Sequence, residues 1–152
     1  MLLNKERGRR FKPSGEDIVA QTRPFSSCLA GIEPAAVPLL VASLVLIGSA
    51  PPTIISPIDV TGIGSLEPDV LVFDVDALET DPLETIRMTR FLLRSGLIAI
   101  YTGTLTQSWG RACHLAGANC LLSKDAGEDR TALGLMHSIR GGCFTDPAFE
   151  AA

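Results

Sequence analysis

Short apolar runs alternate along this chain with longer segments of mixed polarity. Strand-like runs separated by helix-like segments are typical of an α/β fold with a parallel sheet. The clearest strand is DVLVFD at residues 69–74, and LIAIY at residues 97–101 is a second one. Runs this uniformly apolar are expected where both faces of a sheet are covered. The other expected strands are residues 18–20, 43–49 and 120–123.

The segments between these runs predict the helices. The best marked helix covers residues 81–96, because Asp81 can cap its start, Pro82 suits the first helical position and Glu84 completes a capping box. Gly96 is typical of a helix end. The other helices are expected at residues 24–37, 56–67, 107–116 and 127–140.

Two acids follow the clearest strand, Asp74 at its end and Asp76 two positions later. Residues two apart in a strand point to the same face, so both carboxylates can leave one strand end together. Three interpretations are open. Phosphatases of the haloacid-dehalogenase type carry D-x-D after a buried strand, receiver domains carry one phospho-accepting Asp there, and ordinary turn acids also follow strands.

Four segments in order favour the second interpretation: PDVLVFD from 68, IAIYTG from 98, AGANCLLSKD from 116 and SIRGGCFTDP from 138. They resemble motifs of response-regulator receiver domains of the NarL/FixJ type. The resemblance implies that Asp74 is the phospho-acceptor position and that Thr102 and Lys124 are the switch and phosphate-contact positions. It also implies a doubly wound (βα)5 domain, a five-stranded parallel sheet in the flavodoxin-like order 2-1-3-4-5, with its site at the carboxyl edge.

The acidic pair of this family is missing. The family opens with a strand followed by Asp-Asp-His-Pro. In the preferred register, IVAQTRPF supplies that strand and puts Gln21 and Thr22 at the acid positions. An alternative register uses LVLIGSAPP and puts Gly48 and Ser49 there. Both registers lack the pair, so the resemblance is to an atypical receiver.

This loss bears on metal binding. Phosphoryl transfer to a carboxylate uses Mg²⁺ to neutralise charge, and Mg²⁺ prefers several oxygen ligands in octahedral geometry. Only Asp74 and Asp76 remain as weak ligands, so no metal or other cofactor is expected. Lys124 would instead pair with Asp74 and keep it ionised. Leu121 also replaces an aromatic residue that often swings inward on activation of the family.

Each candidate residue can also be explained by an ordinary structural role instead of a functional one. Thr102 alone would be a strand-end hydroxyl, and Lys124 alone a surface lysine. Asp76 is expected to be a solvated loop acid, with part of a displaced metal site as the alternative. His114 and His137 are expected on helix surfaces or at interfaces.

The phosphatase interpretation is the weakest. It needs Gly-Thr or a similar pair after D-x-D, whereas this chain has Ala77 and Leu78. It also needs an acidic pair on a later strand. The later acids fall at a helix start or in the tail: Asp125, Glu128, Asp129 and Asp146.

Composition and charge limit the classes of partner. The chain has 152 residues, 46% of them apolar and 20% charged, with a net charge of −4. This indicates a globular domain and argues against direct nucleic-acid binding. The basic residues cluster within 5–12, so we expect an extension at 1–16, a receiver-like domain at 17–142, and a tail or the start of a linker at 143–152.

Two further patterns concern the compartment. The four cysteines form neither a C-x-x-C pair nor a zinc spacing, which favours a reduced, cytoplasmic protein. Residues 34–58 carry no charge, but prolines interrupt them, and the densest apolar part is too short to span about 30 Å as a helix. No membrane contact is expected.

Two functions follow from these patterns, neither of them enzymatic in the usual sense. The first is a phosphorylation-independent receiver that acts in signal transduction and transcription regulation through protein contacts, as a homodimer. The alternative is a phospho-accepting receiver that uses Asp74 with a rearranged Mg²⁺ site. The expected partners are a second copy and a sensor kinase, with DNA reached only through a helix-turn-helix module that this chain lacks.

Overall fold

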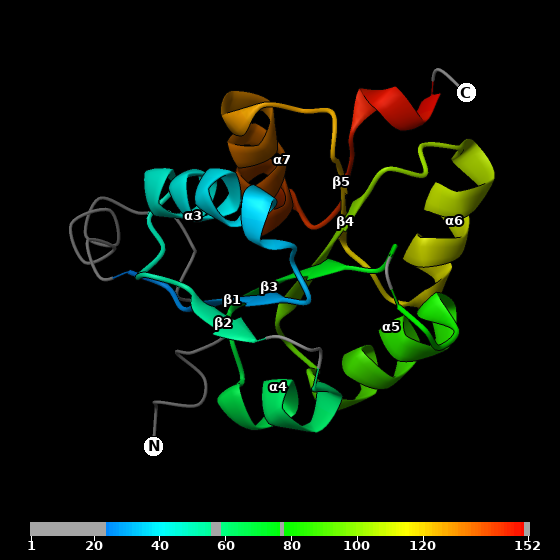
Figure 1. Cartoon of the computed structure of the whole chain (residues 1–152), viewed down its shortest axis with the longest axis horizontal. Coiled ribbons are helices and arrows are strands. Elements are labelled where there is room, and N and C mark those ends of the chain that lie inside the picture. Colours follow the sequence, from blue (N-terminus) through cyan, green and yellow to red (C-terminus); the bar gives the residue numbers. More distant parts are fainter. Residues whose placement is uncertain (1–23, 56–58, 77, 151–152) are drawn as a thin grey trace.

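The computed structural model describes residues 24–55, 59–76 and 78–150. In this part of the chain one parallel sheet runs in the order β2-β1-β3-β4-β5-β6, with helices on both faces (Figure 1). Its strands are β1 Ser27–Ala30, β2 Thr53–Ile55, β3 Val70–Asp74, β4 Leu97–Thr102, β5 Cys120–Ser123 and β6 Phe144–Thr145. The helices are α3 Val37–Leu46, α4 Val60–Leu66, α5 Pro82–Leu92, α6 Gln107–Ala116 and α7 Glu128–Gly141, with short 3-10 helices η1 Pro34–Ala36 and η2 Pro147–Glu150.

Two apolar layers enclose the sheet. Helices α3 and α7 cover one face, and α4, α5 and α6 cover the other (Figure 1). Successive residues of a strand point to opposite faces. Leu71 and Phe73 of β3 accordingly pack with α4, α5 and α6, whereas Val70 and Val72 pack with α3 and α7. This two-sided burial explains why the sequence of β3 is uniformly apolar.

Helix α5 begins as its sequence predicts. The carboxylate of Asp81 accepts a hydrogen bond from the backbone N–H of Leu83, and Pro82 occupies the first turn. At the other end, the side chain of Arg90 donates to the carbonyl oxygens of Leu93, the C-cap residue, and of Gly96 in the segment that leads to β4. These contacts confirm a helix in this segment and anchor it beside β4.

The first half of the chain differs from the prediction. The expected helix at 24–37 is wrong, since this segment holds β1 and η1. The expected strand at 43–49 is also wrong, because its first residues complete α3. Leu40 and Leu44 are fully buried while Leu46 is 61% exposed, which is a helical rather than an alternating pattern. The basic extension at 1–16 and the expected strand at 18–20 lie outside the described residues.

The expectation of five strands is wrong by one strand. The order 2-1-3-4-5 is present, and β6 extends it beside β5. Helix α7 ends at Gly141, and Gly142 adopts a φ of 104°, a conformation that favours glycine, which turns the chain back to the sheet. The backbone N–H of Phe144 then donates to the carbonyl oxygen of Asn119.

The segment after β6 packs against the domain. Asp146 is 1% exposed, and both of its carboxylate oxygens accept hydrogen bonds from the guanidinium of Arg130, at 2.7 and 3.2 Å. Phe149 is also 1% exposed and lies in the apolar layer that includes Leu121. Residues 143–150, in the region that the sequence predicts as a tail or linker, therefore contribute a strand and a core side chain.

All four cysteines are free. Cys28, Cys113 and Cys120 are buried, and burial raises the pKa of the Cys28 thiol to about 11 and of the other two to about 12. Cys143, between α7 and β6, is exposed. Among the described helices, none is long and apolar enough to cross a bilayer.

Candidate functional site

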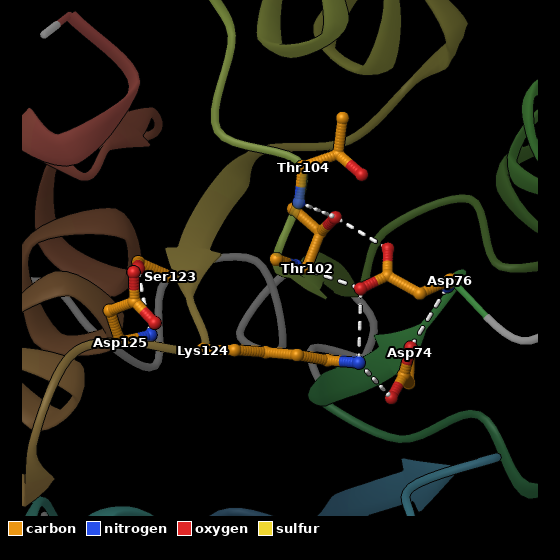
Figure 2. A network of polar contacts seen from close by, with 8 residues as sticks. Asp74, Asp76, Thr102, Thr104, Ser123, Lys124 and Asp125 are labelled. Carbon is orange, nitrogen blue, oxygen red and sulfur yellow. Dashed lines mark hydrogen bonds and ion pairs between the residues drawn. The ribbon is translucent and has the colours of Figure 1, made fainter. Parts of the chain in front are cut away.

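Three neighbouring strands bring Asp74, Thr102 and Lys124 to one edge of the sheet. Asp74 ends β3, Thr102 ends β4, and Lys124 follows β5 directly. The ammonium nitrogen of Lys124 lies 2.9 Å from Oδ2 of Asp74, whose side chain is 4% exposed (Figure 2). The convergence that the sequence predicts is therefore present. The roles of the three residues as phospho-acceptor, switch and phosphate-contact positions stay predictions.

Asp76 belongs to the same cluster: it is the loop acid that the sequence predicts, but its carboxylate is engaged by neighbouring groups. The residue as a whole is exposed, but its side chain is only 26% accessible. One carboxylate oxygen accepts the Thr102 hydroxyl at 2.6 Å, and the other accepts the backbone N–H of Gly103 at 2.8 Å (Figure 2). The second oxygen also lies 3.0 Å from the ammonium of Lys124. Lys124 therefore bridges two carboxylates.

The backbone holds this arrangement in place. The N–H of Asp76 donates to Oδ1 of Asp74 at 2.9 Å, which folds the loop back over the strand end. The N–H of Lys124 donates to the carbonyl oxygen of Thr102 at 3.0 Å, so the starting point of the lysine side chain is also fixed. The Lys124 ammonium lies 5.9 Å from the centre of the Tyr101 ring, within the range of a cation–π contact.

The protonation states follow from these contacts. Burial raises the pKa of Asp76, but hydrogen bonds from Thr102, Gly103 and Lys124 outweigh it and hold the pKa below the ordinary value. Burial lowers the pKa of Lys124, and the two aspartates outweigh it and raise the pKa. Asp76 and Lys124 are therefore both charged at neutral pH.

The Asp76 contacts predict an acid-sensitive contribution to stability. Because the folded-state pKa lies below the ordinary value of 3.8, the contribution is complete above pH 3.8 and is lost as the pH falls through the folded-state pKa. The free energy of unfolding, measured in urea between about pH 6 and pH 2.5, should therefore fall more steeply for the parent than for Asp76→Asn. Asp74 and Lys124 are common to both proteins. An equal slope for the two would contradict the assignment.

The residues that follow the strand on the other side of β3 from β4 are the ones that can face the site from there. Gln21 and Thr22 lie outside the described residues, and the neighbouring strand is β1. The residues after its carboxyl end are Gly31 and Ile32, which carry no carboxylate. Neither expected register is the observed one, because neither Gln21 and Thr22 nor Gly48 and Ser49 follow the strand Ser27–Ala30 that pairs with β3.

Gly48 and Ser49 follow α3, and Ser49 pairs with Phe25 before the amino end of β1, away from the site edge. A signal for the observed register was available in the sequence. The segment CLAGIEP places Pro34 where the family pattern strand–Asp–Asp–His–Pro has its proline. Glu33 then occupies the histidine position, and it is exposed.

These donors fit Mg²⁺ poorly. Asp74 and Asp76 both contact the ammonium of Lys124, which occupies the place where a cation would bind. Among the described residues, no group of three His, Cys, Asp or Glu side chains is arranged to hold a metal ion. The phosphatase interpretation gains no support either, because Asp146 is engaged with Arg130.

The two histidines contact residues outside the cluster around Lys124. The imidazole of His114 lies within hydrogen-bond distance of the Ala118 carbonyl oxygen and the Thr145 hydroxyl, at 2.9 and 2.8 Å, and so connects α6 to β6. His137 is exposed on α7, with its ring 5.8 Å from that of Phe144.

Comparison with known proteins shows which fold this chain shares. No family model matches this chain, and no curated protein matches it. Solved structures do match. One is a two-component response regulator of the LuxR family from Aurantimonas sp. SI85-9A1, with a TM-score of 0.67, 15% identity, and coverage of 84% of this chain and 94% of that one.

A second match is the isolated REC domain of RcsB from Salmonella enterica serovar Typhimurium with the phosphomimetic BeF3-. Its TM-score is 0.68 at 16% identity, covering 84% of this chain and 97% of that one. The fold is that of a receiver domain. A third match, a response regulator from Burkholderia pseudomallei, contains a phosphorylated aspartic acid and a calcium ion, with a TM-score of 0.64, 16% identity, and coverage of 76% and 69%. At these identities the receiver likeness concerns the fold, and the chemistry depends on the residues of this chain.

Proposed function

We propose that this chain is an atypical receiver domain of a two-component-type regulator that acts through protein contacts and without phosphorylation. One observation carries the proposal. Lys124, the cation nearest to Asp74 among the contacts described, is already shared between Asp74 and Asp76, at 2.9 and 3.0 Å. A phosphoryl group that approached Asp74 would meet two carboxylates and one ammonium, which is unfavourable for transfer of a negatively charged group.

The end of β1 supports the same conclusion. Gly31 and Ile32, the two residues directly after that strand, carry no carboxylate. Without such ligands, the charge neutralisation that Mg²⁺ supplies in phosphoryl transfer is weakened. The intact trio of Asp74, Thr102 and Lys124 favours the alternative, a phospho-accepting receiver.

The proposed partners are other protein surfaces. Helix α5 exposes Met88 and Phe91, and Phe91 is 71% accessible, which supports a homodimer or a regulator contact through helical faces. Contact with a sensor kinase, DNA binding through a separate helix-turn-helix module, and a cytoplasmic location belong to the same proposal.

Acetyl phosphate tests the proposal directly. We expect the parent protein, incubated with acetyl phosphate and Mg²⁺, to keep its intact mass and its sedimentation coefficient. Asp74→Asn is the control for non-specific acylation or phosphorylation. A phosphoryl adduct on the parent that is absent from Asp74→Asn would overturn the proposal in favour of the alternative.

A further inference from the structure

Three different donors converge on the carboxylate of Asp76. They are the hydroxyl of Thr102, the backbone N–H of Gly103 and the ammonium of Lys124, at 2.6, 2.8 and 3.0 Å (Figure 2). They come from two adjacent strand ends, β4 and β5, which fix their positions. Asp76 itself comes from a loop that follows a third strand, β3.

Such a donor set is a general oxyanion site. A hydroxyl, an amide N–H and an ammonium each donate to an anionic oxygen, and such charge-assisted hydrogen bonds are stronger than neutral ones. Nothing in this set distinguishes a carboxylate from a phosphate. The site also lies beside Asp74, because Lys124 contacts both aspartates.

We propose that the Asp76 carboxylate is a built-in occupant of this oxyanion pocket, and that the pocket accepts phosphate-type anions when the carboxylate is removed. The inference rests on the proposed function, for which it gives an atomic reason: the receiver carries its own anion where an external one would bind. Asp76 thereby connects the ends of β3, β4 and β5 through contacts that form without phosphorylation of Asp74.

Tethering is the reason why we expect free phosphate not to displace the carboxylate. An intramolecular ligand has an effective concentration of about millimolar or more, and it is held further by the hydrogen bond from the N–H of Asp76 to Asp74. Charge adds to the effect. Two carboxylates and one ammonium give the pocket a net negative charge, whereas removal of Asp76 leaves a neutral pair.

The test is a titration with inorganic phosphate, followed by the amide signal of Gly103 in ¹⁵N-correlated spectra. For Asp76→Ala we expect a saturable shift of this signal and a Kd about tenfold below that of the parent, which corresponds to about 1.4 kcal/mol. Asp125→Asn is the matched control, because it removes one negative charge from the exposed loop after Lys124 and leaves the pocket donors in place. It should bind phosphate as weakly as the parent.

Several outcomes would overturn the inference. They are equal phosphate affinity in the parent and Asp76→Ala, a gain that Asp125→Asn reproduces, or binding that leaves the Gly103 amide unmoved. If Asp76→Ala does not fold, Asp76→Asn keeps the side-chain shape without the charge and should bind phosphate more tightly than the parent. The result is independent of the acetyl phosphate experiment, in which an adduct on the parent at Asp74 would instead contradict the proposed function.

Discussion

Replacing Lys124 by alanine is expected to lower the free energy of unfolding by about 2 to 3 kcal/mol at neutral pH. The loss arises because Asp74, 4% exposed, and the neighbouring carboxylate of Asp76 would lose the ammonium that lies within 3.0 Å of both. Breaking a fully buried pair costs somewhat more, about 3 to 5 kcal/mol, and we expect less here because the Lys124 side chain is 24% accessible. Urea unfolding followed by circular dichroism measures the change.

The chain offers a matched control for this variant. Arg87 and Glu84 form an ion pair of 3.2 Å on the surface of α5, with side chains 55% and 60% accessible. Arg87→Ala should therefore change the stability by less than about 0.5 kcal/mol. A similar loss for both variants would mean that the site pair contributes no more than a surface pair. In the background Asp74→Asn with Asp76→Asn, Lys124→Ala should also have a much smaller effect, which separates charge from packing.

Phe149→Ala is expected to lower the free energy of unfolding by about 3 to 5 kcal/mol. Its ring is 1% exposed and belongs to the apolar layer under α4, α5 and α6, so truncation would leave a cavity against Leu121 and Gly110. Differential scanning calorimetry would show the loss as a lower melting temperature. The expected loss of stability is large because η2 places Phe149 in the core of the domain.

Leu133→Ala is the control, because it also truncates a large apolar side chain to alanine, on α7 at a side chain that is 61% exposed. It should alter the stability by less than about 0.5 kcal/mol. Were Phe149→Ala equally mild, residues 147–150 would act as a tail that leaves the domain at little cost.

The second half of the fold was accessible from the sequence because its local signals agree with each other. The cap at Asp81 and the apolar run before Asp74 each predict the element that the structure contains, whereas the helix expected to reach Gly96 ends at Leu92. Parallel strands bring their carboxyl ends to one edge, so three strand-end residues far apart in sequence could be expected to meet there. Contacts of this kind depend on topology alone.

The first half was not accessible, because its signals are ambiguous. Residues 37–47 are almost entirely apolar, and a run without polar residues shows neither the period of a helix nor that of a strand. The short strand β1 has the sequence SCLA, with a polar start and no β-branched residue, so its strand signal is weak. The longer apolar runs give a stronger strand signal.

The two-residue spacing predicts that Asp74 and Asp76 leave one strand end together, but the partners of the Asp76 carboxylate could not have been predicted from it. Its carboxylate reaches Thr102 and Gly103 because the loop after β3 folds back through the hydrogen bond to Asp74, and that path depends on tertiary contacts. A strand-end pattern places Asp74 well, but it says little about a residue two positions into a loop.

The distribution of the cysteines has a practical consequence. Three thiols are buried with pKa values of about 11 to 12, so at neutral pH they present almost no thiolate to a reagent, while Cys143 is exposed between α7 and β6. A maleimide fluorophore or a nitroxide spin label should therefore attach at one defined point in the natural sequence. Placed there, the label would report whether β6 stays docked on the sheet, and in a dimer it would supply one distance between the two copies.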